Sequence, residues 1–187
     1  FFHTPGLKIV YPSNPYDAKG LLCAALEDPN PYLYFEHKVL YRSIKDQIPD
    51  DYYTVEVGKA SLVSEGNDLS IITYGMGVHW AKEILSTMPG ISADLIDLRT
   101  LLPWDKEAVM ETVKKTGRVL ILHEDTLTGG IGGEIAAWIG EHAFNYLDAP
   151  VLRAASLDTA IPFAATLEQN FLPKGRLKSR IEELLKF

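Results

Sequence analysis

The strongest constraint on this chain is a regular alternation of short apolar stretches with longer stretches of helical period. The short stretches have the length and the β-branched content of strands, and the longer ones place apolar residues three and four positions apart. Strands that alternate with helices predict an α/β fold, in which helices cover a mainly parallel sheet. The expected strands are residues 8–11, 32–35, 69–74, 93–98, 118–122 and 151–154.

The first two strands and the helix between them form one β-α-β unit. Asn14 is a capping side chain and Pro15 stands at the first helical position, so a helix is predicted to begin there. Two prolines in residues 27–31 end this helix. The two strands are expected to be parallel, with a right-handed crossover. Because one such unit cannot cover its own sheet, we expect neighbouring strands upstream or on a partner.

Residues 40–51 are polar and lack a sustained period, which indicates a connection between domains. We therefore expect two regions: an N-terminal region, residues 1–50, which is a piece of one domain with its linker, and a C-terminal region, residues 51–187, which is a domain of its own. In the C-terminal region Asp105 is predicted to cap a helix that ends before Gly117, a position typical of a C-terminal glycine. The last helix is expected from about Gly175.

Composition excludes several functional classes. The 187 residues carry a formal net charge of −7, which argues against a general nucleic-acid binder. No apolar run approaches the ~18 residues of a membrane span. The single cysteine, Cys23, stands among apolar residues, so we expect a buried thiol and a reducing compartment, cytoplasmic or, in a eukaryote, the mitochondrial matrix. Since the chain begins with Phe1 and not with Met, we expect it to be a piece of a longer protein.

Gly75-Met76-Gly77 follows a strand and opens a helix, and Asp97 lies 20 residues beyond Gly77. This is the context of a dinucleotide fingerprint, in which the acid binds a ribose. The third glycine is missing, because Trp80 stands in its place. The alternative is a tight turn, with Asp97 near a sheet edge or an interface.

A second candidate is the glycine-rich segment 126–134, which lies between a strand and a helix and has no Walker lysine. Either a plain turn or an interface or ligand loop explains it. His123-Glu124-Asp125 precedes it at a strand end, where a histidine beside acids can act as a base, but neighbouring strand residues point to opposite faces. The sequence assigns no role to His123, Glu124 or His79. The remaining histidines, His3, His37 and His142, show no zinc-site spacing, and no catalytic centre assembles.

The helix end at residues 25–30 is a third candidate. Free carbonyls at a helix C-terminus, a carboxylate and an amide oxygen can together bind a hard cation. Termination of the helix by two prolines explains the same residues, so both interpretations stay open on spacing alone.

Several segments, taken in order, resemble one family. The first four look like the end of the pyrimidine-binding domain in the beta subunit of thiamine-diphosphate-dependent 2-oxoacid dehydrogenases, and two later ones look like that family's transketolase-type C-terminal domain. The branched-chain (2-oxoisovalerate) branch is most similar around His123-Glu124. The segments are residues 5–12, 18–22, 27–31, 35–42, 96–105, 115–118 and 127–130.

The resemblance implies oxidative decarboxylation of a branched-chain 2-oxoacid, followed by acyl transfer to lipoamide. It also implies thiamine diphosphate with magnesium, bound mainly by regions outside this chain. The family's catalytic glutamate and histidine lie upstream of Phe1, so no catalytic residue is assigned in this chain and its cofactor-binding residues stay unassigned. This portion would supply subunit contacts, a wall of the cofactor pocket and a docking surface, and alone it is expected to be inactive.

The family's beta subunit also binds potassium at this helix end, and the match falls on Ala25 (through its carbonyl), Asp28 and Asn30. The last residue of related beta subunits helps to dock the acyltransferase core, which by position is Phe187. The implied partners are an alpha subunit or alpha-like domain, a second beta subunit and the lipoyl acyltransferase core. The alternatives are pyruvate dehydrogenase, another transketolase-like thiamine enzyme, or a non-catalytic assembly module.

Overall fold

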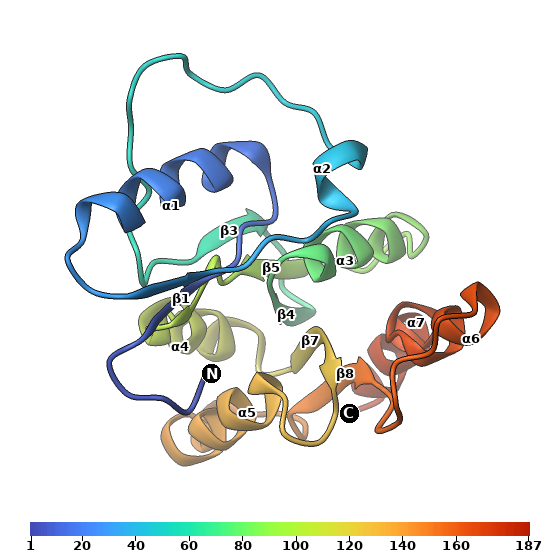
Figure 1. Ribbon diagram of the computed structural model, residues 1–187. Coiled ribbons are helices and arrows are strands. Elements are labelled where there is room, and N and C mark those ends of the chain that lie inside the picture. The colour runs from blue at the N-terminus through green and yellow to red at the C-terminus, as the bar shows by residue number, and fades with distance from the viewer.

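The computed structural model describes all of residues 1–187 and contains two sheets, one of five strands and one of three (Figure 1). The five-stranded sheet has the order β3-β5-β4-β7-β8, and all its pairings are parallel except that of β3 with β5. Its strands are β3 (Ser61–Ser64), β4 (Leu69–Thr73), β5 (Ala93–Asp97), β7 (Val119–Thr126) and β8 (Leu152–Ser156).

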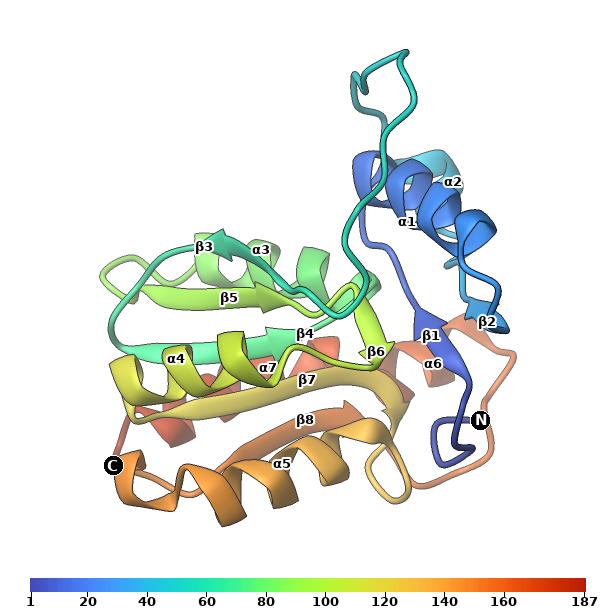
Figure 2. The ribbon, with the colours of Figure 1, turned by 90° about the vertical axis from the view of Figure 1, so that its left-hand side faces the viewer.

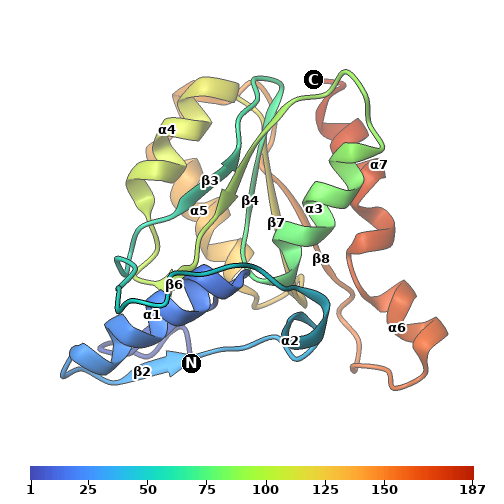
Figure 3. The ribbon, with the colours of Figure 1, turned by 90° about the horizontal axis from the view of Figure 1, so that it is seen from above.

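Helices cover both faces of this sheet, so the C-terminal region has three layers, as the alternation of strands and helices predicts (Figure 3). On one face lie α3 (Met76–Ser86) and α7 (Lys174–Leu184), which contact each other. On the other face lie α4 (Lys106–Thr116) and α5 (Ile131–His142). Two short helices are also present: η1 (Phe144–Tyr146), which follows α5, and α6 (Ala165–Phe171), which precedes α7.

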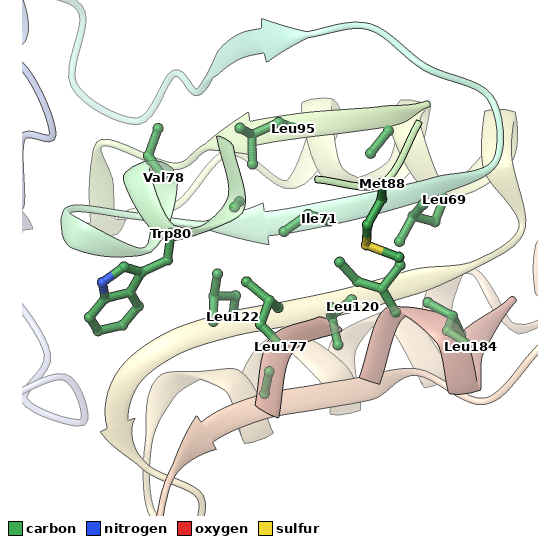
Figure 4. Packing of buried hydrophobic residues seen from close by; sticks show 14 of the residues in the cluster. Leu69, Ile71, Val78, Trp80, Met88, Leu95, Leu120, Leu122, Leu177 and Leu184 are labelled. Atoms are coloured by element: carbon green, nitrogen blue, oxygen red, sulfur yellow. The ribbon is translucent and has the colours of Figure 1, made fainter. Parts of the chain in front are cut away.

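Each face of the sheet has its own apolar core. The α3/α7 side buries a cluster of 15 residues, in which Leu120 and Leu122 of β7 meet Leu177 of α7 (Figure 4). The α4/α5 side buries a cluster of 14. Burying a leucine side chain contributes about 2 kcal/mol to the stability of a fold, so these two cores are the main apolar contribution to the stability of the chain.

The N-terminal region contains β1 (Lys8–Val10), α1 (Pro15–Glu27), β2 (Tyr32–Tyr34) and the short α2 (Leu40–Ser43). β1 and β2 are parallel, as predicted, and the Asn14 side chain caps α1 by accepting the Asp17 N–H. The other neighbour of β1 is β6 (Thr100–Leu102), which comes from the C-terminal region and runs antiparallel to it. One missing neighbour of the β-α-β unit therefore lies within this chain (Figure 2).

The structure corrects several sequence-based expectations. β7 runs to Thr126, four residues beyond the predicted end at Leu122, because its last residues pair with β8 at Thr126–Ser156. The sequence does not predict the short elements β3, β6, α2 and α6, since three to seven residues show no clear period. Cys23 is half-buried and not in a core, because Leu22 and Leu26 on the same helix face solvent. No helix has the length and apolar character that a membrane span requires.

Candidate functional site

The two regions meet at a polar junction centred on Asp97, the last residue of β5. Its carboxylate is buried and accepts a hydrogen bond of 2.5 Å from the Ser13 hydroxyl and one of 3.0 Å from the Arg99 N–H. His79 on α3 places its Nε2 2.7 Å from the Ser13 carbonyl oxygen. Burial, as the largest cause, raises the pKa of Asp97 to about 6. Asp97 therefore lies at an interface, which is one of the positions that the sequence leaves open for it.

Arg99 joins three segments at this junction. Its guanidinium lies 3.1 Å from the Asp17 carboxylate of α1 and donates to the carbonyl oxygens of Lys59 and Ala60, which directly precede β3. Both side chains of the ion pair are largely buried, with 15% exposure for Arg99 and 5% for Asp17. Arg99 also adopts a left-handed backbone with φ of 56°, which is costly for a residue with a Cβ. Arg99 therefore fixes the start of α1 to the C-terminal region.

The glycine turn at residues 75–77 is explained by packing. Gly75 has φ of 54°, and a Cβ there would lie 2.5 Å from the Tyr11 ring. Gly77 lies against Thr73, and Trp80 is buried in the α3/α7 core in place of a third glycine. Because Asp97 is buried and already bonded, it is not free to bind a ribose. The geometry favours the tight turn over the dinucleotide fingerprint.

The glycine-rich segment wraps around His123. A Cβ on Gly130 would lie 2.6 Å from His123 Cε1, and a Cβ on Gly132 would also overlap the imidazole. His123 is fully buried, neither of its ring nitrogens has a hydrogen-bond partner, and burial lowers its pKa. Glu124, the next residue along β7, points to the opposite face of the strand, and no carboxylate hydrogen-bonds to the imidazole. No general-base arrangement forms here.

Between this segment and the N-terminal region lies a cavity of about 990 Å³, which we call the junction cavity. Tyr11 stacks on Phe35 at 5.9 Å between ring centroids and is tilted on Tyr74 at 5.3 Å. His37 Nε2 lies 3.0 Å from the Glu124 carboxylate at its edge. No local pattern in the sequence indicates this group, because its members come from segments far apart in the chain.

The predicted cation site forms a compact polar cluster at the end of α1. The Asp28 carboxylate accepts hydrogen bonds from Lys8, from the Tyr32 hydroxyl, and from the Asn30 backbone and side-chain N–H groups. Lys8, as the largest cause, holds the pKa of Asp28 well below its usual range. A potassium ion at this end of α1 would be held by the three groups that the sequence predicts, which are the Ala25 carbonyl, the Asp28 carboxylate and the Asn30 amide oxygen.

The chain has no cluster of three or more His, Cys, Asp or Glu side chains positioned to hold a metal ion. Phe187, the residue assigned to docking, is exposed at 59%.

Comparison with known proteins decides the family. The family model described as "Transketolase, C-terminal domain" matches residues 58–176, which include the whole five-stranded sheet. The chain belongs to this family. Among solved structures, a split-gene transketolase, described as an inactive beta4 tetramer, superposes with a TM-score of 0.78 at 23% identity, over 98% of this chain and 59% of that one. A transketolase of Pichia stipitis gives 0.63 at 15% identity, over 99% of this chain and 26% of that one. These structures confirm the fold class.

Curated relatives match the whole chain more closely. The 2-oxoisovalerate dehydrogenase subunit beta of Bacillus subtilis (strain 168) is 48% identical over 100% of this chain and 58% of its own length. The mitochondrial counterpart of Dictyostelium discoideum is 47% identical over 92% of this chain and 47% of its own length. The pyruvate dehydrogenase E1 component subunit beta of Bacillus subtilis is 45% identical over 92% and 53%. The chain thus spans about half the length of the curated relatives it matches.

Proposed function

We propose that the chain belongs to the beta subunit in the decarboxylating component of a 2-oxoacid dehydrogenase complex. The observation that carries the proposal is the 48% identity to a 2-oxoisovalerate dehydrogenase beta subunit, which extends over the whole chain, including the N-terminal region. Within that family a branched-chain 2-oxoacid is our proposed substrate. Pyruvate is the alternative, since pyruvate dehydrogenase beta subunits are nearly as similar.

The arrangement of the chain supports a role in assembly and in shaping the cofactor pocket. When bound in such an enzyme, thiamine diphosphate supplies the carbanion chemistry that decarboxylates the 2-oxoacid. This chain's residues would hold a domain that begins upstream against the C-terminal domain, through Ser13, Asp97 and Arg99. We assign no catalytic step to a residue of this chain.

The partners also belong to the proposal: an alpha subunit or alpha-like domain, a second beta subunit and the lipoyl acyltransferase core, with Phe187 at the docking surface. The exposed Phe187 ring is available for such a contact. We further propose a potassium ion at the end of α1, held through the Ala25 carbonyl, Asp28 and Asn30, with the Asp28 carboxylate also ordering the loop.

A chimaera tests the function. This chain replaces the matching region of the Bacillus subtilis 2-oxoisovalerate dehydrogenase beta subunit, and the product is assembled with that enzyme's alpha subunit and thiamine diphosphate. We expect 2-oxoacid-dependent turnover with kcat/KM higher for 2-oxoisovalerate than for pyruvate. The chain alone, with the same cofactors, is expected to give no turnover.

A matched control uses the corresponding region of the Bacillus subtilis pyruvate dehydrogenase beta subunit in the same background. A chimaera that folds and forms a tetramer but shows no turnover would contradict a role in this enzyme. The non-catalytic assembly module would then be the remaining alternative. A higher kcat/KM for pyruvate than for 2-oxoisovalerate would overturn the branch assignment only.

A further inference from the structure

The junction cavity combines aromatic walls with an excess of carboxylates. Its aromatic wall is formed by Tyr11, Phe35 and Tyr74, from the end of β1, the segment after β2 and the end of β4. Burial, as the largest cause, raises the pKa of Tyr11 to about 12 and raises the pKa of Tyr74 as well. Both phenols therefore stay neutral near pH 7, and the wall presents neutral ring faces.

Four carboxylates line the same cavity: Glu124, Asp125, Glu134 and Glu168. Only Glu124 has an ion-pair partner, His37, whereas the other three form none. Apart from the imidazole of His3, no lining side chain can carry a positive charge. The cavity therefore has an unbalanced negative charge beside aromatic faces, the combination that binds an organic cation.

The same cavity contains the N-terminus of α5, but the charge there excludes an anion. Glu134 lies in the first turn of that helix, and Asp125 lies at the cavity wall. His123 lies behind Gly130 with its Cε1–Nδ1 edge against this wall, and both ring nitrogens lack a partner. Since burial lowers its pKa, His123 adds an unsatisfied polar group but no positive charge.

The rim of the cavity is apolar and exposed. Ile161 lines it with 71% exposure, and Phe163 and Leu167, which follow along the chain, are also exposed. A small solute would leave such a rim in water, whereas a polypeptide would cover it. A contiguous exposed apolar surface of this kind is typical of a protein-binding site.

We propose that the junction cavity receives an arginine side chain of a partner polypeptide. The planar guanidinium stacks on the Phe35 and Tyr74 side of the wall and donates paired hydrogen bonds to the Asp125 carboxylate, which has no ion-pair partner. Arginine fits better than lysine because an ammonium group lacks the planar face and the forked donors that this geometry uses. The inference concerns a contact between chains and does not depend on which 2-oxoacid the complex uses.

Titration with N-acetyl-L-arginine amide, followed by the amide resonances of Gly129, Gly130 and Gly133, tests the proposal. These glycines line the cavity and report occupancy directly. We expect saturable shifts that weaken as salt is added, and no shifts with N-acetyl-L-citrulline amide, which has the same shape without charge. Asp125→Asn is expected to weaken binding about tenfold, since one charge-assisted pair is lost.

Two further variants keep the test specific. Glu111→Gln removes the same charge from an exposed position on α4 and should leave the affinity unchanged. Phe35→Leu removes the aromatic ring but keeps an apolar side chain at this position. It should therefore weaken arginine binding without unfolding the chain. Equal shifts with the citrulline compound or with N-acetyl-L-norleucine amide would overturn the proposal, as would equal loss in the Glu111 variant or no saturable shift at all.

Discussion

The N-terminal and C-terminal regions both alternate strands with helices, yet they bury their apolar residues to very different degrees. The five-stranded sheet of the C-terminal region has buried clusters of 15 and 14 residues on its two faces, and only Ile9 in the second cluster comes from the N-terminal region. In the N-terminal region the corresponding cluster has three residues, Val10, Leu21 and Val55, and Val55 comes from the C-terminal region. Leu26 and Tyr41 are exposed at 78% and 62%.

The difference arises from the number of strand neighbours. β4 and β5 have a strand on each side and are buried at every residue, whereas β2 is the edge of a three-stranded sheet and is only half-buried throughout. An amphipathic pattern in the sequence therefore predicts which face of a helix or strand can be buried. That face is buried only where another strand or helix packs against it. The N-terminal region depends on its junction with the C-terminal region, through β6, Asp97 and Arg99.

The largest expected effect comes from truncating a buried side chain in the C-terminal region, compared with truncating an exposed side chain in the N-terminal region. Leu120→Ala removes a fully buried side chain from the larger cluster and should lower the free energy of unfolding by about 4 kcal/mol. Leu26→Ala, on the exposed face of α1, should change it by less than about 0.5 kcal/mol. Urea denaturation of both variants measures the contrast. A comparable loss in the Leu26 variant would mean that this face is covered, and the comparison would fail.

The junction itself gives the next effect. Arg99→Ala leaves the Asp17 carboxylate buried without its partner and should lower the free energy of unfolding by about 3 kcal/mol. Arg99→Gly loses the same guanidinium but relieves the left-handed backbone, so it should be about 1 kcal/mol more stable than the alanine variant. Chemical denaturation of the two variants tests this ranking, and the reverse order would show that the backbone at residue 99 is not strained.

Asp97 predicts a pH dependence of the junction. Its pKa in the folded chain is about 6, above the usual 3.8, because the carboxyl is buried. Folding therefore favours the neutral carboxyl group. The resulting contribution to the free energy of unfolding is fully present below about pH 4 and is lost as the pH rises through about 6. The loss is about 3 kcal/mol in the free energy of unfolding, and it is complete above about pH 7.

Unfolding curves of the wild type and of Asp97→Asn between pH 4 and pH 7 isolate this contribution, since other carboxyl groups titrate equally in both chains. The wild type should lose stability relative to the variant as the pH rises. A difference that does not change with pH would show that Asp97 titrates in its ordinary range.

The smallest effect concerns the proposed potassium ion. Asp28→Ala removes the partner of Lys8 and the hydrogen bond that orders Asn30. The variant should therefore show a smaller increase in Tm than the wild type when choline chloride is replaced by KCl. Asp68→Ala removes a similar loop carboxylate, bonded to Ser92, and serves as the control. Equal Tm of the wild type in the two salts would remove the case for a potassium site.

Local signals in the sequence predict much of the fold. Asn14 and Pro15 begin α1, the Asp105 side chain accepts the Ala108 N–H at 3.0 Å, and Gly117 has the left-handed φ of 63° that ends α4. Each of these features depends on residues within four positions of one another. Such short-range rules hold because capping and turn geometry are satisfied locally.

The junction could not be predicted in the same way. Asp97 has the spacing of a ribose-binding acid, and only the three-dimensional structure brings Ser13 onto its carboxylate. β6 has three residues without a period, and its pairing with β1 joins segments far apart in the chain. The junction cavity likewise draws on β1, β4, β7 and α6. Contacts of this kind depend on how the layers pack, which no local pattern specifies.

Hydrogen exchange of the wild-type chain, followed amide by amide, tests the contrast between the two regions most directly. We predict that the amides of β1 and α1 exchange through openings of lower free energy than those of β4 and β7, so the N-terminal region opens while the five-stranded sheet stays closed. Exchange of both groups at one common free energy, equal to that of global unfolding, would contradict the account, because it would make the two regions a single cooperative unit.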